Sequence, residues 1–171
     1  SLEKSERIRF ILCRHEQGAA FMAEIYGRLT GHTAGCLGTL GPGATNLITG
    51  VADSNMDRAP MLVLTGQGST ERLHKESHQI MDVVHMFEPV TKWATTILHE
   101  NNLPEIVRKA VRVARTEKPG AVHIELPEDT AAATRVGADG VGGDQGAQPG
   151  ARCRSLRRGL GSMPAAGRTQ G

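Results

Sequence analysis

The stretch IRFILCRHEQGAAFMAEIYGRLTG, residues 8–31, places a short apolar run directly before an amphipathic one. The first part, IRFIL at 8–12, is rich in Ile and Phe, and this composition favours a buried strand. From Glu16 onward the pattern favours a helix. A strand followed by a helix is the repeating unit of parallel sheets, and here a carboxylate lies at the junction between the two.

The same alternation continues to about Thr130. Apolar, β-rich runs predict further strands at 34–40, 61–66, 90–98 and 121–126, and amphipathic runs predict helices at 41–57 and 103–115. Gly or Pro occurs at the joints between them. The expected fold is therefore α/β, a doubly wound and mainly parallel sheet with helices on both faces.

The chain changes character after Thr130. Residues 131–171 are dominated by Gly, Ala and Arg, lack aromatic residues and show no apolar period. Such a segment buries too little apolar surface to offset its conformational entropy, so we expect disorder. The expected organisation is one folded domain over 1–130 and a disordered tail over 131–171. A GC-rich gene translated in a shifted frame would give the same composition.

Overall composition excludes several classes of function. The chain has 171 residues, the size of one domain, and its 20 basic and 18 acidic residues leave a net charge of +2 with no basic stripe for nucleic acid or a membrane surface. No segment predicts a membrane span or a signal peptide. Cys13, Cys36 and Cys153 are widely spaced and odd in number, which favours reduced thiols and a cytoplasmic location.

Glu16 is the first candidate for chemistry. Ligands of open α/β sheets bind beyond the carboxyl ends of the strands, and Glu16 follows IRFIL by four residues. The alternative is an acid that only stabilises a helix N-terminus. A second candidate is the turn at 41–46, GPGATN, which precedes a helix as ligand-binding glycine loops do. Its spacing matches neither a P-loop nor a dinucleotide fingerprint, so a plain strand-to-helix turn remains the alternative.

Three histidines fall within residues 74–85. Their spacing lacks an HExxH glutamate or neighbouring Cys and Asp ligands, so we predict no metal site there. A polar loop or short helix at the mouth of a cleft fits better. We expect His78 and Gln79 to face a ligand, and Phe87 and Trp93 to pack.

Taken together and in this order, five stretches resemble the N-terminal pyrimidine-binding domain of thiamine-diphosphate enzymes, most of all the acetolactate synthase large subunits. The resemblance covers about residues 7–130. The five stretches are RHEQGAAFMAEIYGRLTG, GTLGPGATNLITGVADSNMDRAPMLVLTGQ, SHQIMD, FEPVTKW and KPGAVHIELPED.

The resemblance implies a role for each candidate residue. The glutamate of the RHE element, here Glu16, would hydrogen-bond the aminopyrimidine of the cofactor and favour the imino tautomer, whose exocyclic nitrogen takes the proton from the thiazolium carbon. Gln79 would lie near the reacting carbon as a second catalytic residue. The residues implied in cofactor binding are Glu16, Gly41, Pro42, Gly43 and Asn46.

The resemblance also implies an activity and partners. The intact enzyme would decarboxylate a 2-keto acid, typically pyruvate, and join it to a second one. Magnesium would be held by a second catalytic domain, and FAD is left open because some relatives bind it and others do not. The intact enzyme would be a homodimer or tetramer, in which Glu16 of one subunit reaches the cofactor held by another.

Parts of the family pattern are absent from this sequence. The GDG…NN element that binds magnesium and diphosphate has no equivalent, since GGDQG at 142–146 lacks the later asparagines. The family also places a strand and a helix before the point corresponding to Ser5, and a sheet without that strand would leave unpaired edges. We therefore expect a domain truncated at its N-terminus, without turnover of its own.

Three alternatives remain open. The intact enzyme could be a glyoxylate carboligase, a sulfoacetaldehyde acetyltransferase or a simple 2-keto acid decarboxylase, although glyoxylate carboligase lacks the carboxylate that Glu16 provides. The chain could instead be a non-catalytic interaction fragment that pairs with a full-length subunit. It could also be a frame-shifted gene product without a role.

Overall fold

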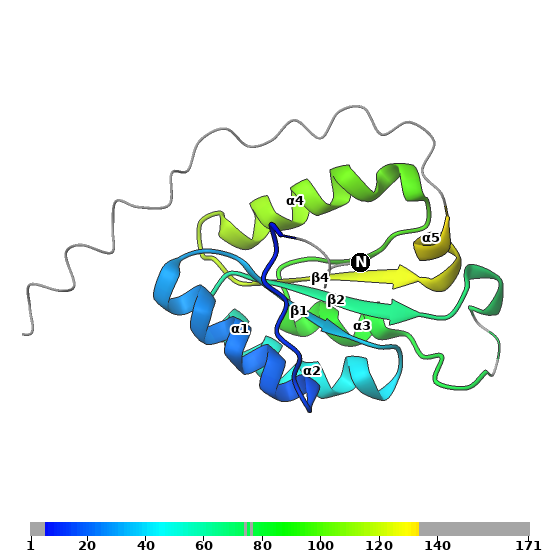
Figure 1. Ribbon diagram of the computed structural model, residues 1–171, viewed down its shortest axis with the longest axis horizontal. Coiled ribbons are helices and arrows are strands. Elements are labelled where there is room, and N and C mark those ends of the chain that lie inside the picture. Colours follow the sequence, from blue (N-terminus) through cyan, green and yellow to red (C-terminus); the bar gives the residue numbers. More distant parts are fainter. Residues whose placement is uncertain (1–5, 74, 76, 134–171) are drawn as a thin grey trace, which may run out of the picture. The chain divides into compact units, whose positions relative to one another are not determined.

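The computed structural model describes residues 6–73, 75 and 77–133. Within these residues the core is a four-stranded parallel sheet of order β1-β2-β4-β3 (Figure 1). The strands are β1 (Ala34–Gly38), β2 (Met61–Gln67), β3 (Ala94–Thr96) and β4 (Ala121–Pro127). The α-helices are α1 (Glu16–Thr30), α2 (Pro42–Met56), α3 (Val83–Phe87), α4 (Leu103–Arg115) and α5 (Glu128–Ala132), and the 3-10 helices are η2 (Thr70–Arg72), η3 (Glu88–Val90) and η4 (Glu100–Asn102).

Helices cover both faces of the sheet, which confirms the predicted α/β class. Successive side chains of a strand point to opposite faces, so each strand contributes to two cores. On one face Met61 and Val63 of β2 pack with residues of α1, α2 and α3. On the other face Leu62 and Leu64 pack with Ile106 and Ala110 of α4. Figure 1 shows α4 on one side of the sheet, and α1, α2 and α3 on the other.

α1 and α2 pack side by side and run in the same direction. Small residues allow this close approach, because a Cβ on Gly50 would lie 2.6 Å from the Cβ of Ala20. The N-terminus of each helix therefore lies at the same end of the pair. This arrangement brings Glu16, the first residue of α1, next to the first turn of α2.

The predicted strand at 8–12 is wrong. Residues 8–12 form no strand, and Ile8, Phe10, Ile11 and Leu12 are exposed, Leu12 by 86 %. In Figure 1 this dark blue segment crosses in front of the sheet as a plain coil. A strand needs hydrogen bonds from a neighbour, and within the described residues none pairs with this segment. Apolar composition therefore does not suffice to make it a strand.

For the other predicted helices and strands, the structure tests their lengths and their first and last residues. The predicted helix at 103–115 is confirmed at both ends, whereas the strand predicted at 90–98 shortens to Ala94–Thr96. Phe87 is buried as predicted, and Trp93 is partly buried against the cluster that α4 covers. Most of the predicted tail at 131–171 lies outside the described residues, which end at 133. No helix among the residues described here is both long and apolar enough to cross a membrane.

Candidate active site

Glu16 opens α1 at a well-formed helix start. His15 is the N-cap in extended conformation, and its Nδ1 accepts a hydrogen bond from the amide of Gln17 at 3.2 Å. Backbone amides at a helix N-terminus are free to face a negative charge, which stabilises a carboxylate there. The side chain of Glu16 is half-buried.

The Glu16 carboxyl group turns toward the first turn of α2. Asn46 Nδ2 donates to Glu16 Oε2 at 3.2 Å, and a Cβ on Gly43 would lie 3.4 Å from Glu16 Oε1. A hydrogen bond from its own backbone amide, and then the one from Asn46, hold the pKa of Glu16 below its usual value. The group is thus an ionised carboxylate with one oxygen occupied by Asn46.

The turn before α2 has a backbone that favours glycine. Gly41 has φ 58° and ψ −119°, and Pro42, which lacks an N–H, follows at the start of the helix. A Cβ at Gly41 would lie 2.8 Å from the Cβ of Gln79 and 2.9 Å from its carbonyl oxygen. Gly41 is therefore the point at which this turn contacts the segment that carries Gln79.

Gln79 lies in an exposed turn between η2 and α3 and has φ 61°. His78 beside it is also exposed, whereas His74 lies outside the described residues. The predicted site residues therefore form two contacts, Glu16 with Gly43 and Asn46, and Gln79 with Gly41. The first turn of α2 connects them.

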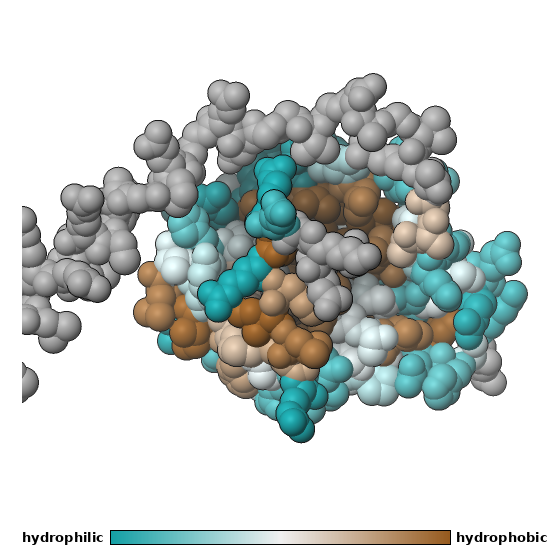
Figure 2. All heavy atoms as spheres, in the orientation of Figure 1, coloured by the Kyte–Doolittle hydropathy of each residue, from teal (hydrophilic) through white to brown (hydrophobic). Residues whose placement is uncertain are grey.

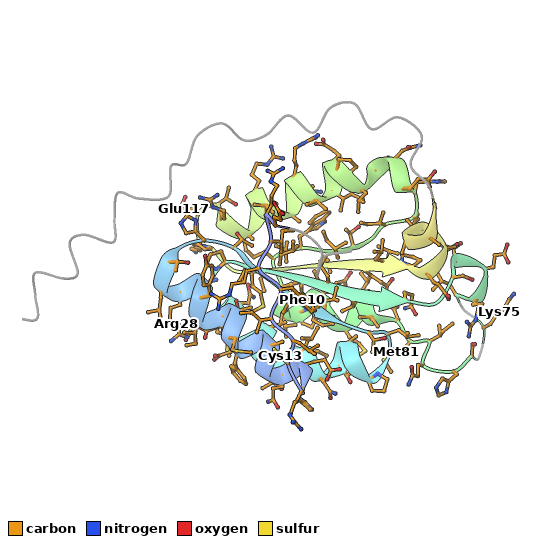
Figure 3. All side chains as sticks on the ribbon, viewed as in Figure 1. Phe10, Cys13, Arg28, Lys75, Met81 and Glu117 are labelled. Atoms are coloured by element: carbon orange, nitrogen blue, oxygen red, sulfur yellow. The ribbon has the colours of Figure 1, made fainter. Side chains whose placement is uncertain are left out.

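A cavity of about 390 Å³ lies at the carboxyl ends of β2, β3 and β4. Its lining includes Gln67, Met81, Thr96 and Glu125, and Figure 3 labels Met81 below the arrowheads of the central strands and Lys75 beyond them. None of the residues predicted for the site lines it. The contacts around Glu16 form a separate surface feature, and it is these contacts that contain the residues with the predicted chemistry.

Sequence reasoning missed a polar network beside this cavity. Gln67 Nε2 donates to Glu125 Oε1 at 2.8 Å, and Thr96 Oγ1 donates to Glu125 Oε2 at 2.7 Å. Gln67 and Glu125 are each only 4 % exposed. Desolvation by burial raises the pKa of Glu125 despite these hydrogen bonds. The available signal was a Gln near the end of one mostly apolar strand and a Glu near the end of another.

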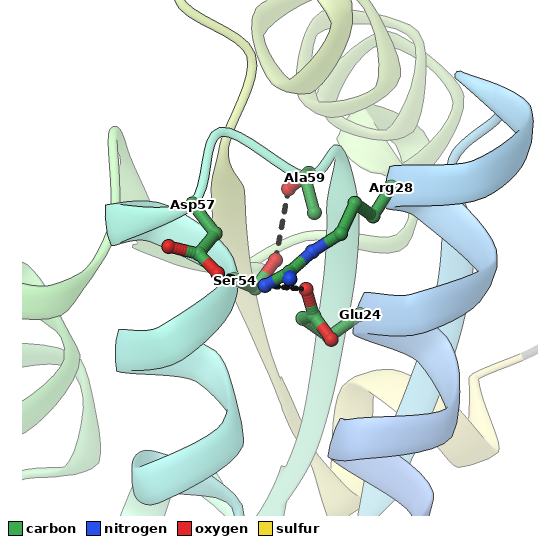
Figure 4. Close-up of polar contacts among 5 residues, drawn as sticks. All are labelled: Glu24, Arg28, Ser54, Asp57 and Ala59. Atoms are coloured by element: carbon green, nitrogen blue, oxygen red, sulfur yellow. Dashed lines mark hydrogen bonds and ion pairs between the residues drawn. The ribbon is translucent and has the colours of Figure 1, made fainter.

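An acidic cluster lies further along the helices, away from the candidate site. Carboxylate oxygens of Glu24, Asp53 and Asp57 lie within 4.8 Å of one another. The guanidinium of Arg28 forms ion pairs with Glu24 and Asp57 and so already supplies a cation (Figure 4). This cluster therefore ties the helices together and is not a candidate for metal binding.

Comparisons with known proteins assign the chain to a family. Residues 1–86 match the family described as thiamine pyrophosphate enzyme, N-terminal TPP binding domain. The probable acetolactate synthase large subunit of Methanococcus aeolicus is 45 % identical over 119 residues, which cover 70 % of this chain and 20 % of that protein.

Two relatives from Escherichia coli give a similar result. The acetolactate synthase isozyme 1 large subunit of strain K12 is 39 % identical over 129 residues, 75 % of this chain and 23 % of that protein. The glyoxylate carboligase of strain O157:H7 is 40 % identical over 130 residues, 75 % of this chain and 22 % of that protein. The chain thus spans about a fifth of the length of the curated relatives that it matches. Because the family match extends over half of its residues, the chain belongs to the thiamine pyrophosphate enzymes, as an N-terminal TPP-binding domain.

Proposed function

We propose that this chain is the pyrimidine-binding part, over residues 1–130, of an acetolactate-synthase-like enzyme. The intact enzyme would decarboxylate a 2-keto acid such as pyruvate and join the product to a second 2-keto acid. The observation that carries the proposal is the Glu16 carboxylate, held at the start of α1 against Gly43 and Asn46. The family match and the acetolactate synthase relatives support it.

The residues at this surface fit the pyrimidine end of thiamine diphosphate. Gly41 and Gly43 let the turn before α2 pack closely, because a Cβ on Gly41 would collide with Gln79 and a Cβ on Gly43 with Thr39, and the position of Gly43 leaves room for Glu16 Oε1 beside it. When bound, the cofactor supplies the carbanion chemistry that decarboxylation requires. The residues of this chain would orient the ring and hold a proton at Glu16. Asn46 would fix the carboxylate through its other oxygen.

The proposed role of Glu16 requires that its carboxylate be partly shielded from water. A hydrogen-bonded carboxylate at a helix N-terminus ionises readily, whereas sharing a proton with a ring nitrogen requires partial desolvation. In our proposal a second subunit supplies that desolvation and also supplies magnesium ligands. FAD would bind, if at all, through parts outside this segment.

A subunit interface on α1 forms part of the proposal. Hydrophobic surface gathers over this helix (Figure 2), where Phe21, Met22, Ile25, Tyr26 and Leu29 are all exposed. Large exposed apolar patches mark interaction surfaces. A homodimer or tetramer of the intact enzyme would cover this helix. A cytoplasmic location is also proposed, and the two cysteines that the structure describes, Cys13 and Cys36, are free thiols.

Glyoxylate carboligase is the second candidate because a relative of that name is 40 % identical. The presence of Glu16 argues against this second candidate, because the family resemblance implies that glyoxylate carboligases lack a carboxylate at this position. An interaction fragment without catalytic function is the candidate from another class. It would pair with an intact subunit but would not contribute Glu16 to chemistry.

A chimera tests the proposal. Residues 7–130 replace the matching segment of the Escherichia coli acetolactate synthase relative, and carbon dioxide release from pyruvate is measured with thiamine diphosphate and magnesium. We expect activity in the chimera and a loss of about a hundredfold or more with Glu16→Gln, the size of a general acid–base contribution. Glu117→Gln, at an exposed residue within the transferred segment but outside the site, serves as control. Full activity with Glu16→Gln would exclude the proposed role, and an inactive but folded chimera would favour the interaction fragment.

A further inference from the structure

The network of Gln67, Glu125 and Thr96 lies on the sheet face that packs against α2 and α3. Thr96 and Glu125 are direct neighbours across the β3–β4 pair, and Gln67 lies two residues beyond Thr65, which is the β2 neighbour of Glu125. Side chains two apart on a strand share a face, so the register brings all three together. Sequence separation of up to 58 residues hides this arrangement.

Gln67 makes three hydrogen bonds. Its Nε2 donates to Glu125 Oε1 at 2.8 Å and to the carbonyl oxygen of Met81 at 2.9 Å, and its Oε1 accepts from the amide of Gly68 at 3.0 Å. Both N–H donors of the amide are therefore occupied. Glu125 sets the orientation of the Gln67 side-chain amide. Because Glu125 Oε1 accepts a hydrogen bond, the nitrogen of the amide faces Glu125, and the same nitrogen then also reaches the carbonyl oxygen of Met81.

The segment 79–81 is held at three successive residues. Gly41 contacts Gln79, and a Cβ on Gly68 would lie 2.7 Å from Ile80 Cδ1. The carbonyl of Met81 is held by Gln67. The exposed turn containing Gln79 is thereby attached to the end of β2 and, through Gln67 and Glu125, to β4.

We propose that Gln67 and Glu125 are positioning residues that fix the backbone of Gln79 against the glycine turn before α2. As a statement about catalysis, this rests on the function proposed above. Glu125 touches neither the turn nor Glu16 in any contact that the structure describes, so it acts through Gln67. Glu125 Oε1 accepts from Gln67 Nε2, so Gln, which keeps an acceptor oxygen, is the conservative replacement and Leu, which has none, is the disruptive one.

The test is hydrogen exchange in the full 171-residue chain, without cofactor, followed by mass spectrometry of peptides spanning 77–84. We expect exchange in this segment to accelerate about tenfold with Gln67→Leu or Glu125→Leu, the effect of losing a buried hydrogen bond on local opening. Exchange with Glu125→Gln should stay within about twofold of wild type, because the amide again provides an acceptor for Gln67.

Thr65→Val is the matched control. It removes the buried bond between Thr65 Oγ1 and His123 Nε2, 2.8 Å long, on the same face of the same two strands but without contact to 79–81. Equal acceleration at 77–84 with Thr65→Val, or none with either leucine variant, would overturn the proposal. If the leucine variants unfold, Thr96→Val, which removes the hydrogen bond to Glu125 Oε2, takes their place. Faster exchange at 77–84 in this variant would support the proposal, and unchanged exchange would refute it. Since no cofactor is present, the result is independent of whether Glu16 supports chemistry.

Discussion

At the residue scale, the balance between hydrogen bonding and burial sets the pKa of the two glutamates that matter most. Glu16 is half-buried and receives hydrogen bonds from its own backbone and from Asn46, so its pKa falls. Glu125 also receives hydrogen bonds, yet desolvation outweighs them and its pKa rises. The same residue type therefore has a lowered pKa at the end of one helix and a raised pKa within a strand.

His123 is a third titratable group whose state is set by burial. It is fully buried, its ring stacks on Phe87 with a centroid distance of 4.2 Å, and desolvation lowers its pKa to about 4. Nδ1 of this histidine has no hydrogen-bond partner within the described structure. A proton added to His123 would therefore be poorly solvated in the folded state.

Stability should consequently fall as the pH drops from about 6.5 to about 4. In this range the unfolded chain binds a proton at position 123 and the folded chain does not, so protonation favours unfolding. The two pKa values imply a loss of about 3 kcal/mol in the free energy of unfolding. Urea unfolding of wild type and His123→Leu at pH 7 and pH 4.5 measures it. The difference between the two pH values should shrink in the variant, and an unchanged difference would assign the pH dependence to other groups.

Gly41→Ala tests the backbone of the turn before α2. The φ of 58° with ψ −119° is unfavourable for any L side chain, and the new Cβ would collide with Gln79. We expect the free energy of unfolding to fall by about 1–3 kcal/mol. Gly18→Ala in α1 is the control, because a Cβ there meets nothing within 4 Å and alanine favours helix. Equal stability of the two variants in urea would show that the turn is not constrained.

At the element scale, the parallel pair of α1 and α2 is fastened at both ends. Glu16 and Asn46 join the N-termini, and Arg28 joins the C-termini through Glu24 and Asp57 (Figure 4). The contact of Arg28 with Glu24 Oε1 at 2.6 Å is an ion pair without hydrogen-bond geometry. Glu24 is 1 % exposed, so its carboxylate depends on Arg28 for compensation of charge.

Arg28→Met should therefore destabilise the chain. It keeps the length of the side chain but leaves the buried Glu24 carboxylate unpaired, at a cost of about 2 kcal/mol once the partial exposure of Arg28 is considered. Arg108→Met is the control, because it removes an exposed pair with Glu105 in α4 that contributes little. Both free energies of unfolding come from urea titration at pH 7. Similar losses in the two variants would contradict the assigned role of the Arg28 cluster.

At the scale of the whole described unit, β1 and β3 are the two edge strands of the sheet. On the side of β1, no described strand pairs with its outer edge, Leu37 is 53 % exposed, and apolar side chains of the N-terminal segment and of α1 are exposed as well. Unpaired edges and apolar faces promote association with other chains. The exposed residues concerned are Ile8, Phe10, Ile11, Leu12, Phe21, Met22, Ile25, Tyr26, Leu29 and Leu37.

Association of the chain in solution should depend on the exposed face of α1. Ile25→Lys places a charge in the middle of this face and should lower the average mass in sedimentation equilibrium at equal protein concentration. Leu98→Lys, at an exposed site outside α1 and β1, should leave the mass of wild type unchanged. Equal masses for Ile25→Lys and wild type would indicate that α1 does not mediate association.

The sequence by itself determined the alternation of strands and helices, the α/β class and the limits of α4, because these follow from local apolar periodicity and from Gly and Pro at the joints. It also placed Glu16 at a helix start. Tertiary structure alone decided that residues 8–12 are not a strand, since strand formation depends on a neighbour that local sequence does not contain. It likewise decided the pairings of Glu16 with Asn46 and of Gln67 with Glu125, which come from helix packing and strand register over 30 and 58 residues of separation.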